Sequence, residues 1–285
     1  MSRGGVANLI RLGVTSIERT MFCDRPGPVQ ELLDSGFVAD TPADYCPRCG
    51  QSIGPNEFVD GTCSACRSAK LPWGGVVRLG PYEPHLRGPI HQFKFERWHT
   101  LGEHLGHALG ATVSERLRQV AEHAGEPLAA ITSRSVVVPV PMSFWRRASR
   151  GIDHANCLGS SVAKGAGLPM ARWLRRQHRP AQTGLSHAAR KKNLRGAMSS
   201  RLEPDEVGSP RVIVVVDDVM TTGATLIEAC RAIHKFGKAR SGEAQELPAI
   251  LVATIAVSSQ KPRKGAVTPL VESIPGPKSV MVQKK

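Results

Sequence analysis

The sequence lacks any hydrophobic run long enough to cross a bilayer, which takes about 20 apolar residues. The longest apolar run, residues 250–257, has the length of a strand. Near the start of the chain Arg11 interrupts the apolar residues around Leu9 and Ile10, and no continuous apolar stretch of the signal-peptide type follows. We therefore expect a cytoplasmic protein with no membrane insertion.

Aromatic side chains are also scarce, at 5% of the 285 residues. Proteins that bind single-stranded nucleic acid commonly stack bases on aromatic rings. Few aromatic residues lie near the most basic part of this chain, namely Phe144, Trp145 and Trp173. A base-stacking platform is therefore poorly supported, which favours a small phosphate-containing ligand as the main reason for the charge described next.

Acidic residues are nearly absent from that basic part of the chain. Between Ser133 and Arg201, fourteen lysines and arginines accompany a single acidic residue, Asp153, and the whole chain carries a formal net charge of +14. Such a stretch must face something anionic or be strongly solvated. Nucleic acid and a phosphate-rich small substrate would each explain it, so charge alone does not decide between them.

Four of the seven cysteines form two Cys-x-x-Cys pairs separated by thirteen residues: Cys46, Cys49, Cys63 and Cys66. This spacing is typical of structural zinc held by four thiolates with no open coordination position. The alternative is four free or redox-active thiols. Residues 43–70 have few large apolar side chains and cannot fold on a core of their own. We expect a small zinc ribbon with one structural Zn²⁺, in a reducing compartment.

Downstream of the ribbon, short apolar runs alternate with segments of helical periodicity. A long amphipathic helix is expected to have Pro89 in its first turn and to run to Val113. Strands are expected at 76–79, 136–140, 171–174, 211–216 and 247–257, and further helices at 155–166 and 224–236. Strands with intervening helices imply an α/β fold with a mostly parallel, doubly wound sheet.

Two basic segments have little apolar periodicity. Residues 175–200 read as a long mobile loop, a kind of segment usually kept for function. Residues 258–285 are dominated by proline, glycine and lysine, and we expect a disordered tail there. The domain organisation is therefore expected to be an irregular segment at 1–42, the ribbon at 43–70, a catalytic-type domain at 71–257 and the tail at 258–285.

The most specific motif joins the expected strand at 211–216 to the expected helix at 224–236. The strand delivers two adjacent carboxylates at its carboxyl end, where ligands bind in open α/β sheets. Hydroxyls and a glycine follow directly before the helix, and free N–H groups at a helix start can hold a phosphate. The motif consists of Asp217, Asp218, Thr221, Thr222, Gly223, Ala224 and Thr225. The alternative is a plain strand-turn-helix in which Asp217, Asp218 and Thr221 only cap the helix.

This motif resembles the phosphoribosyl pyrophosphate (PRPP) motif of type I phosphoribosyltransferases. The resemblance implies that Asp217 and Asp218 meet the ribose hydroxyls and that the loop 221–225 holds the 5′-phosphate. It also implies that Mg²⁺ bridges the pyrophosphate. The implied reaction is displacement at the anomeric carbon through an oxocarbenium-like state, in which the protein mainly positions groups and neutralises charge.

A zinc ribbon ahead of such a domain resembles the ComF family, named for its link to competence and DNA uptake in bacteria. The resemblance covers about residues 45–257. Besides the two motifs, it rests on Tyr82, Ile90, Lys94, Phe95, residues 138–141, Arg147, Arg150, Gly151, residues 179–185, Arg190 and Asn193. It implies a type I phosphoribosyltransferase-like fold in which residues 175–195 form a hood over the substrate.

The family resemblance also implies further substrate-binding residues. Arg150, Gln182 and Arg190 are expected to bind substrate, and the loop after residues 139–141 is expected to approach the pyrophosphate. One departure is Asp153-His154, where the family usually has Asn-Gln. An aspartate beside a pyrophosphate would be repelled unless a metal or an arginine compensates. The ten histidines show no ligand spacing, and surface or core roles are expected for them.

Two functions remain open at this point, with a structural protein carrying a relict site ranked behind both. The first is an enzyme that transfers a phosphoribosyl group to an unidentified acceptor. The second is a PRPP-sensing or DNA-uptake accessory protein that binds without turnover, with single-stranded DNA or DNA-uptake and helicase proteins as partners. The second is favoured by the ribbon and by the basic residues of the tail: Lys261, Arg263, Lys264, Lys278, Lys284 and Lys285.

Overall fold

The structure is a computed structural model, which describes residues 31–32, 34–54, 57–95, 99–142, 153–177, 196–201, 210–241 and 247–259. The expectations for Cys23, for most of the segment 1–42, for the interior of the hood and for the tail lie outside these residues. None of the helices in the described part of the chain combines the length and the apolar character that a bilayer crossing requires.

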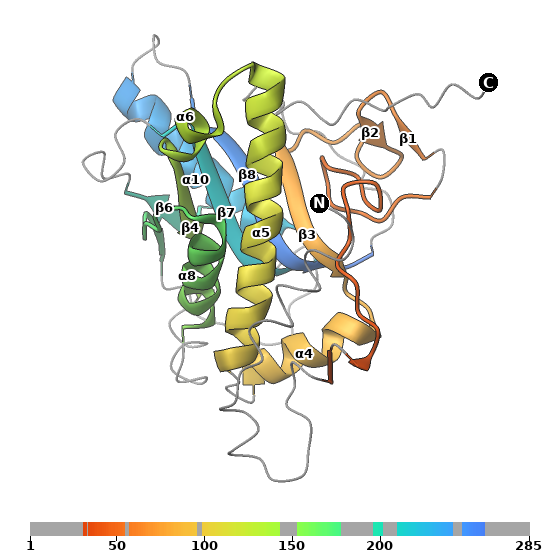
Figure 1. Ribbon diagram of the computed structural model, residues 1–285. Coiled ribbons are helices and arrows are strands. Elements are labelled where there is room, and N and C mark those ends of the chain that lie inside the picture. Colours follow the sequence, from red (N-terminus) through yellow and green to blue (C-terminus); the bar gives the residue numbers. More distant parts are fainter. Residues whose placement is uncertain are drawn as a thin grey trace, which may run out of the picture.

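A four-stranded parallel sheet forms the centre of the molecule (Figure 1). Its strands are β3 (Gly75–Pro81), β8 (Ala249–Val257), β7 (Val212–Met220) and β4 (Ser135–Pro139), in that spatial order, and each neighbouring pair is parallel. The strands are nearly continuous runs of buried, mostly β-branched residues, as expected for a sheet covered on both faces. The prediction of an α/β fold with a parallel sheet is confirmed.

Helices cover both faces of this sheet. On the near face in Figure 1, α5 (His99–Ala124) and α8 (His154–Ala166) pack on the strands, and α10 (Ala224–Ser241) lies behind. The two helices of the near face approach closely: a Cβ at Gly110 would lie 2.5 Å from the Val162 oxygen, and a Cβ at Gly165 would lie 2.6 Å from the His107 oxygen. Glycine is required at both positions because any side chain would force the helices apart. A short helix, α6 (Leu128–Thr132), leads from α5 into β4.

The long helix expected from Pro89 to Val113 is instead two helices. Helix α4 runs over Pro84–Phe95 and α5 begins at His99. The first residue of α4 is Pro84, whose fixed φ suits that position. Pro89, which was expected in the first turn, lies inside the helix. The apolar pattern ran on across the break because Phe93 and Leu101 face the same core. Figure 1 shows α4 below the carboxyl ends of the strands.

Two small antiparallel ladders complete the described structure. Strands β1 (Phe58–Val59) and β2 (Thr62–Cys63) form the ribbon hairpin, and the positive φ of both Asp60 and Gly61 is what a tight hairpin turn requires. Strands β5 (Leu174–Arg176) and β6 (Met198–Ser200) pair with each other. The prediction that all of 175–200 is a loop was therefore wrong at its two ends, and the strand predicted at 171–174 begins later, at Leu174.

Candidate functional site

The two adjacent aspartates lie at the carboxyl end of β7, in the middle of the sheet. Strand β7 continues to Met220, four residues beyond the predicted end, and Asp217 is paired with Thr254 of β8. Both carboxylates are half-buried. The Asp218 N–H donates to Asp217 Oδ1 at 2.9 Å, and the Thr254 hydroxyl donates to the Asp218 carbonyl oxygen at 3.0 Å. The backbone of both strands thus fixes the position of the acid pair.

Burial and like charge together perturb the first of these acids. Burial and, after it, the neighbouring Asp218 carboxylate raise the pKa of Asp217 to about 7, although Lys94 and Arg176 act in the opposite direction. A carboxyl group in this state needs cations or hydrogen-bond donors to hold its charge at neutral pH. The arrangement is therefore suited to a ligand that brings hydroxyl donors or a metal ion.

A lysine from a distant helix reaches the second acid. Lys94, in the last turn of α4, places its Nζ 2.9 Å from Asp218 Oδ1. The two side chains are 19% and 24% exposed, so this pair is shielded from solvent more than a surface ion pair. Lys94 belongs to the residues that carried the family resemblance, but no role at the site was predicted for it. Its position places one positive charge at the edge of the acid pair.

The threonine-glycine loop connects β7 to the start of α10. Gly223 has φ of 66°, a conformation that favours glycine, and α10 begins at the next residue. The Ala224 N–H donates to Thr222 Oγ1 at 3.3 Å, so the side chain of Thr222 binds the first N–H of α10. Thr221 is exposed, and the first N–H groups of an α-helix have no partner within the helix. The structure brings together Asp217, Asp218 and the whole loop 221–225.

The base of the predicted hood is attached close to this loop. Arg176, at the end of β5, is near enough to Asp217 to lower its pKa. The Gly196 N–H donates to Glu228 Oε2 at 2.8 Å, and Arg231 binds the other oxygen of the same carboxylate at 2.8 Å. Glu228 belongs to α10, so the start of this helix holds both the phosphate-type loop and the end of the hood. The predicted substrate residues Arg150, Gln182 and Arg190 lie outside the described residues.

The aspartate that departs from the family pattern has a local structural role. Asp153 is the N-cap of α8: its Oδ1 accepts from the Asn156 N–H at 3.2 Å and its Oδ2 from Asn156 Nδ2 at 2.6 Å. His154 is buried, 2% exposed, with its ring edge-on to Phe93. The pair Asp153-His154 thus starts a helix and fills the core, which is enough to explain these residue types.

The four predicted cysteines come together in one buried cluster. Their Sγ atoms all lie within 4.8 Å of one another; Cys49 and Cys63 are 3.5 Å apart, Cys46 and Cys66 3.7 Å, and Cys63 and Cys66 3.8 Å. Sulfur atoms bound tetrahedrally to zinc at about 2.3 Å would be about 3.8 Å apart. Hydrogen bonds from the Cys49 and Cys66 thiols lower the pKa of Cys46, which favours thiolate. The donor set and its geometry fit one Zn²⁺ ion with no open position.

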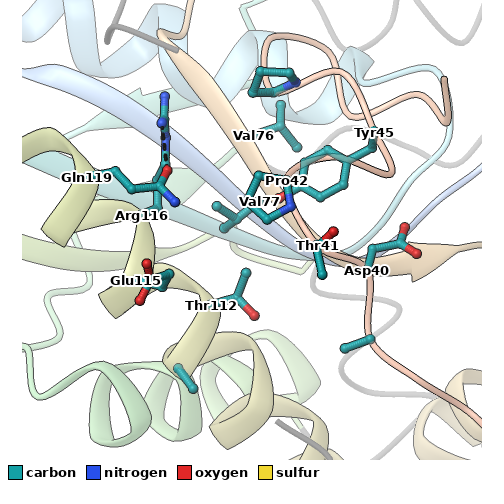
Figure 2. A pocket seen from close by; sticks show the side chains of 13 residues that line it. Asp40, Thr41, Pro42, Tyr45, Val76, Val77, Thr112, Glu115, Arg116 and Gln119 are labelled. Atoms are coloured by element: carbon teal, nitrogen blue, oxygen red, sulfur yellow. Dashed lines mark hydrogen bonds between the residues drawn. The ribbon is translucent and has the colours of Figure 1, made fainter. Parts of the chain in front are cut away.

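A cavity of about 80 Å³ lies away from the predicted site, between residues 39–47, β3 and α5 (Figure 2). Tyr45 borders it from one side and Arg116 from α5, where Arg116 Nη1 donates to Gln119 Oε1 at 3.1 Å. Burial raises the pKa of Tyr45 to about 12 and lowers the pKa of Arg116. No sequence signal pointed to this cavity, because Tyr45 and Arg116 are 71 positions apart and belong to no motif.

The perturbed acid gives a stability prediction. Asp217→Asn is expected to raise the free energy of unfolding of the ligand-free protein by about 1–3 kcal/mol at pH 8. The folded pKa lies above the ordinary value of 3.8, so the native state binds the proton more tightly and stability falls as pH rises from about 4 to about 7. Asparagine does not titrate and so avoids that loss. The stability difference between Asp217→Asn and wild type should therefore shrink towards pH 4. Urea unfolding at pH 4.5, 6 and 8 measures this; a gain that is equal at all three values would contradict it.

Comparison with known proteins gives a consistent set of relatives. The chain is 28% identical over 195 residues to Competence protein F of Haemophilus influenzae, which covers 68% of this chain and 80% of that protein. It is 30% identical over 212 residues to DNA utilization protein YhgH of Escherichia coli, covering 71% of this chain and 83% of the relative. The YhgH protein of Salmonella typhi is 29% identical over 204 residues, 68% of this chain and 79% of that protein. No family model matches the sequence.

Proposed function

The chain belongs to the ComF family, and we propose that it binds PRPP together with Mg²⁺ at the carboxyl end of β7, in a role in DNA utilisation. The observation that carries the proposal is the sequence of groups along β7 and α10: two half-buried carboxylates, then a threonine-glycine loop, then a helix start. Carboxylates suit a ribose diol, and the helix start suits its 5′-phosphate. A type I phosphoribosyltransferase-like fold for residues 71–257 is part of the same proposal.

Each part of the site has a task in this proposal. Asp217 and Asp218 accept hydrogen bonds from the ribose hydroxyls, which stabilises the ionised form of Asp217 that burial disfavours. The N–H groups and hydroxyls of 221–225 hold the 5′-phosphate. Bound Mg²⁺ supplies charge neutralisation at the pyrophosphate. Lys94 keeps the acid pair partly neutralised before the ligand arrives, since its Nζ contacts Asp218 Oδ1.

Transfer, in this proposal, is a displacement at the anomeric carbon. The bond from that carbon to the pyrophosphate oxygen breaks, pyrophosphate leaves with the electron pair, and a nucleophile of the acceptor forms the new bond. The chain contributes positioning and charge rather than a covalent intermediate. The hood, whose ends β5 and β6 are held beside α10, would close over the substrate and exclude water. Arg150, Gln182 and Arg190 are proposed to bind the substrate.

A second candidate function is favoured by the names of the relatives and by the charge. The proteins named for competence and DNA utilisation suggest that this chain assists DNA uptake, as a PRPP-responsive protein that does not turn over. The formal net charge of +14 would suit single-stranded DNA or an acidic protein partner, including DNA-uptake and helicase proteins. An affinity for single-stranded DNA that falls steeply with salt concentration would favour this function, because phosphate contacts release counterions.

Calorimetric titration with PRPP, with and without Mg²⁺, tests the main proposal. We expect magnesium-dependent binding in the wild type and loss of affinity by at least 100-fold, about 3 kcal/mol, in Asp217→Asn/Asp218→Asn. Glu126→Gln serves as the control, because Glu126 binds Arg211 beside the amino end of β7, at the opposite end of the strand from the acid pair. Circular dichroism checks that each variant is folded. Unchanged affinity in the double variant, or no binding by the wild type, would refute the site.

A further inference from the structure

The residues that flank the first cysteine pair and the phosphate-type loop pack against each other, although Gly50 and Thr221 are 171 positions apart in the sequence. Gly50 follows Cys49 directly, has φ of 74°, and donates its N–H to the Cys46 oxygen at 2.7 Å. A Cβ built at Gly50 would lie 3.1 Å from Met220 Cε. Met220 is the last residue of β7 and immediately precedes the loop. The backbone of residues 46–51, called the knuckle below, thus packs against Met220, the residue before the loop.

Further close contacts hold the same glycine against the ends of the sheet strands. The Cβ built at Gly50 would lie 2.9 Å from Val76 Cγ1 and 3.1 Å from Val257 Cγ2. Val76 and Val257 belong to the same hydrophobic cluster as Met220 and the four cysteines. A side chain at Gly50 would therefore displace either the knuckle or the end of β7, because tightly packed atoms have no free volume to take it up.

A series of hydrogen bonds follows the same route. The Cys46 N–H donates to the Gln51 oxygen at 2.8 Å, Gln51 Nε2 donates to the Ser258 oxygen at 3.1 Å, and the Ser258 N–H donates to the Met220 oxygen at 2.9 Å. These bonds connect Cys46 of the ribbon, through Gln51 and through Ser258 after β8, to Met220 at the end of β7. A shift of the knuckle therefore changes a bond to the residue that precedes Thr221.

Arg78 is a third connection between the knuckle and the sheet, besides the packing at Gly50 and the bonds of Gln51. This arginine lies within β3 and is 1% exposed. Its Nη1 donates to the Gly50 oxygen at 2.6 Å, and its Nη2 donates to Ser52 Oγ at 2.8 Å. A buried guanidinium in which each of the three nitrogens donates a hydrogen bond gives this junction one defined geometry.

We propose that the zinc knuckle positions the phosphate loop, so that the state of the four-cysteine cluster controls how well residues 221–225 are ordered for a sugar phosphate. The knuckle has little core of its own, and its conformation depends on the metal that its cysteines hold. Loss of the metal frees Gly50 and Gln51 from their contacts with Met220 and Ser258. The part of this inference that concerns ligand affinity depends on the PRPP function proposed above, whereas the coupling between knuckle and loop does not.

Two glycine variants test the coupling under matched strain. Gly50→Ala and Gly61→Ala each place a side chain at a ribbon glycine of similar positive φ, 74° and 72°, but a Cβ at Gly61 meets no atom within 4 Å. Hydrogen–deuterium exchange of the peptide covering 220–227 is the readout, with zinc content measured in the same samples. We expect exchange at least tenfold faster in Gly50→Ala than in wild type, and unchanged in Gly61→Ala. Equal exchange in all three proteins, with zinc retained, overturns the proposal.

A third variant covers the case in which Gly50→Ala fails to fold. Gln51→Ala removes the side-chain bond to Ser258 without placing an atom at Gly50, and we expect the same peptide to exchange about three- to tenfold faster while one zinc per chain is retained. PRPP titration of the same proteins separates the two hypotheses. If wild type does not bind PRPP, the proposed function fails, and the exchange data still decide the coupling. If wild type binds and Gln51→Ala shows neither faster exchange nor weaker binding, the coupling is wrong.

Discussion

Arg78→Ala is expected to lower the free energy of unfolding by about 3–5 kcal/mol, because removing one partner of a buried ion pair leaves the other charge uncompensated. Arg78 binds Asp40 through Nη2 at 2.6 Å and Nε at 2.9 Å, and Asp40 is 17% exposed at its side chain. The substitution also leaves the Gly50 oxygen and Ser52 Oγ without this donor and removes the guanidinium that lies 5.0 Å from the Tyr45 ring centroid. Urea unfolding followed by circular dichroism measures the loss.

Arg118→Ala is a matched control for that experiment. Arg118 pairs with Glu115 one turn earlier on α5, and its side chain is 42% exposed, so its removal should cost less than about 1 kcal/mol. The loss in Arg78→Ala should also depend on pH. Burial already raises the pKa of Asp40, and without the arginine that pKa rises further. The loss in free energy of unfolding of Arg78→Ala, relative to wild type, should therefore be larger at pH 8 than at pH 5. A loss in Arg78→Ala as small as that in Arg118→Ala would show that the buried pair contributes little.

The parts of the molecule that could be predicted from the sequence are those whose signal is local. The acid pair, the loop and the start of α10 occupy consecutive positions. A buried strand followed by a glycine and a helical pattern is compatible with few structures other than a strand-loop-helix unit. The cysteine spacing is equally direct, because two Cys-x-x-Cys pairs bring suitable donors together in a short segment. Periodicity also gave the strands of the parallel sheet, with errors at their ends.

The contacts that complete the site could not be predicted, because they join distant parts of the chain. Lys94 and Asp218 are 124 residues apart, and nothing in either neighbourhood indicates that they meet. Arg78 lies in a strand, where an arginine usually points to solvent, and its burial depends on Asp40 and the knuckle. Strands β5 and β6 have three residues each, so their pairing depends on packing against α10 rather than on propensity. These contacts arise from tertiary packing, for which a single sequence carries no pattern.

Cys66→Ser is expected to abolish zinc binding and to lower the melting temperature by about 10–15 °C, which corresponds to several kcal/mol. All four cysteines are buried in the cluster that also contains Trp73, Val76 and Met220, so a protein without the metal would leave four thiols packed against the sheet with no ion between them. Elemental analysis of protein purified without oxygen should give one zinc per chain in the wild type. Differential scanning calorimetry measures the shift.

Cys157→Ser provides the control for the loss of a thiol as such. Cys157 lies in α8, partly exposed and outside the cluster, so this variant should keep one zinc and melt within about 2 °C of the wild type. Added Zn²⁺ should restore chelator-treated wild type but not Cys66→Ser, because only the wild type retains four thiolates. Two zinc ions per chain, or an unchanged melting temperature in Cys66→Ser, would contradict the four-thiolate site. A ribbon that melts separately, before the sheet, would show that the two unfold independently and would count against coupling between the knuckle and β7.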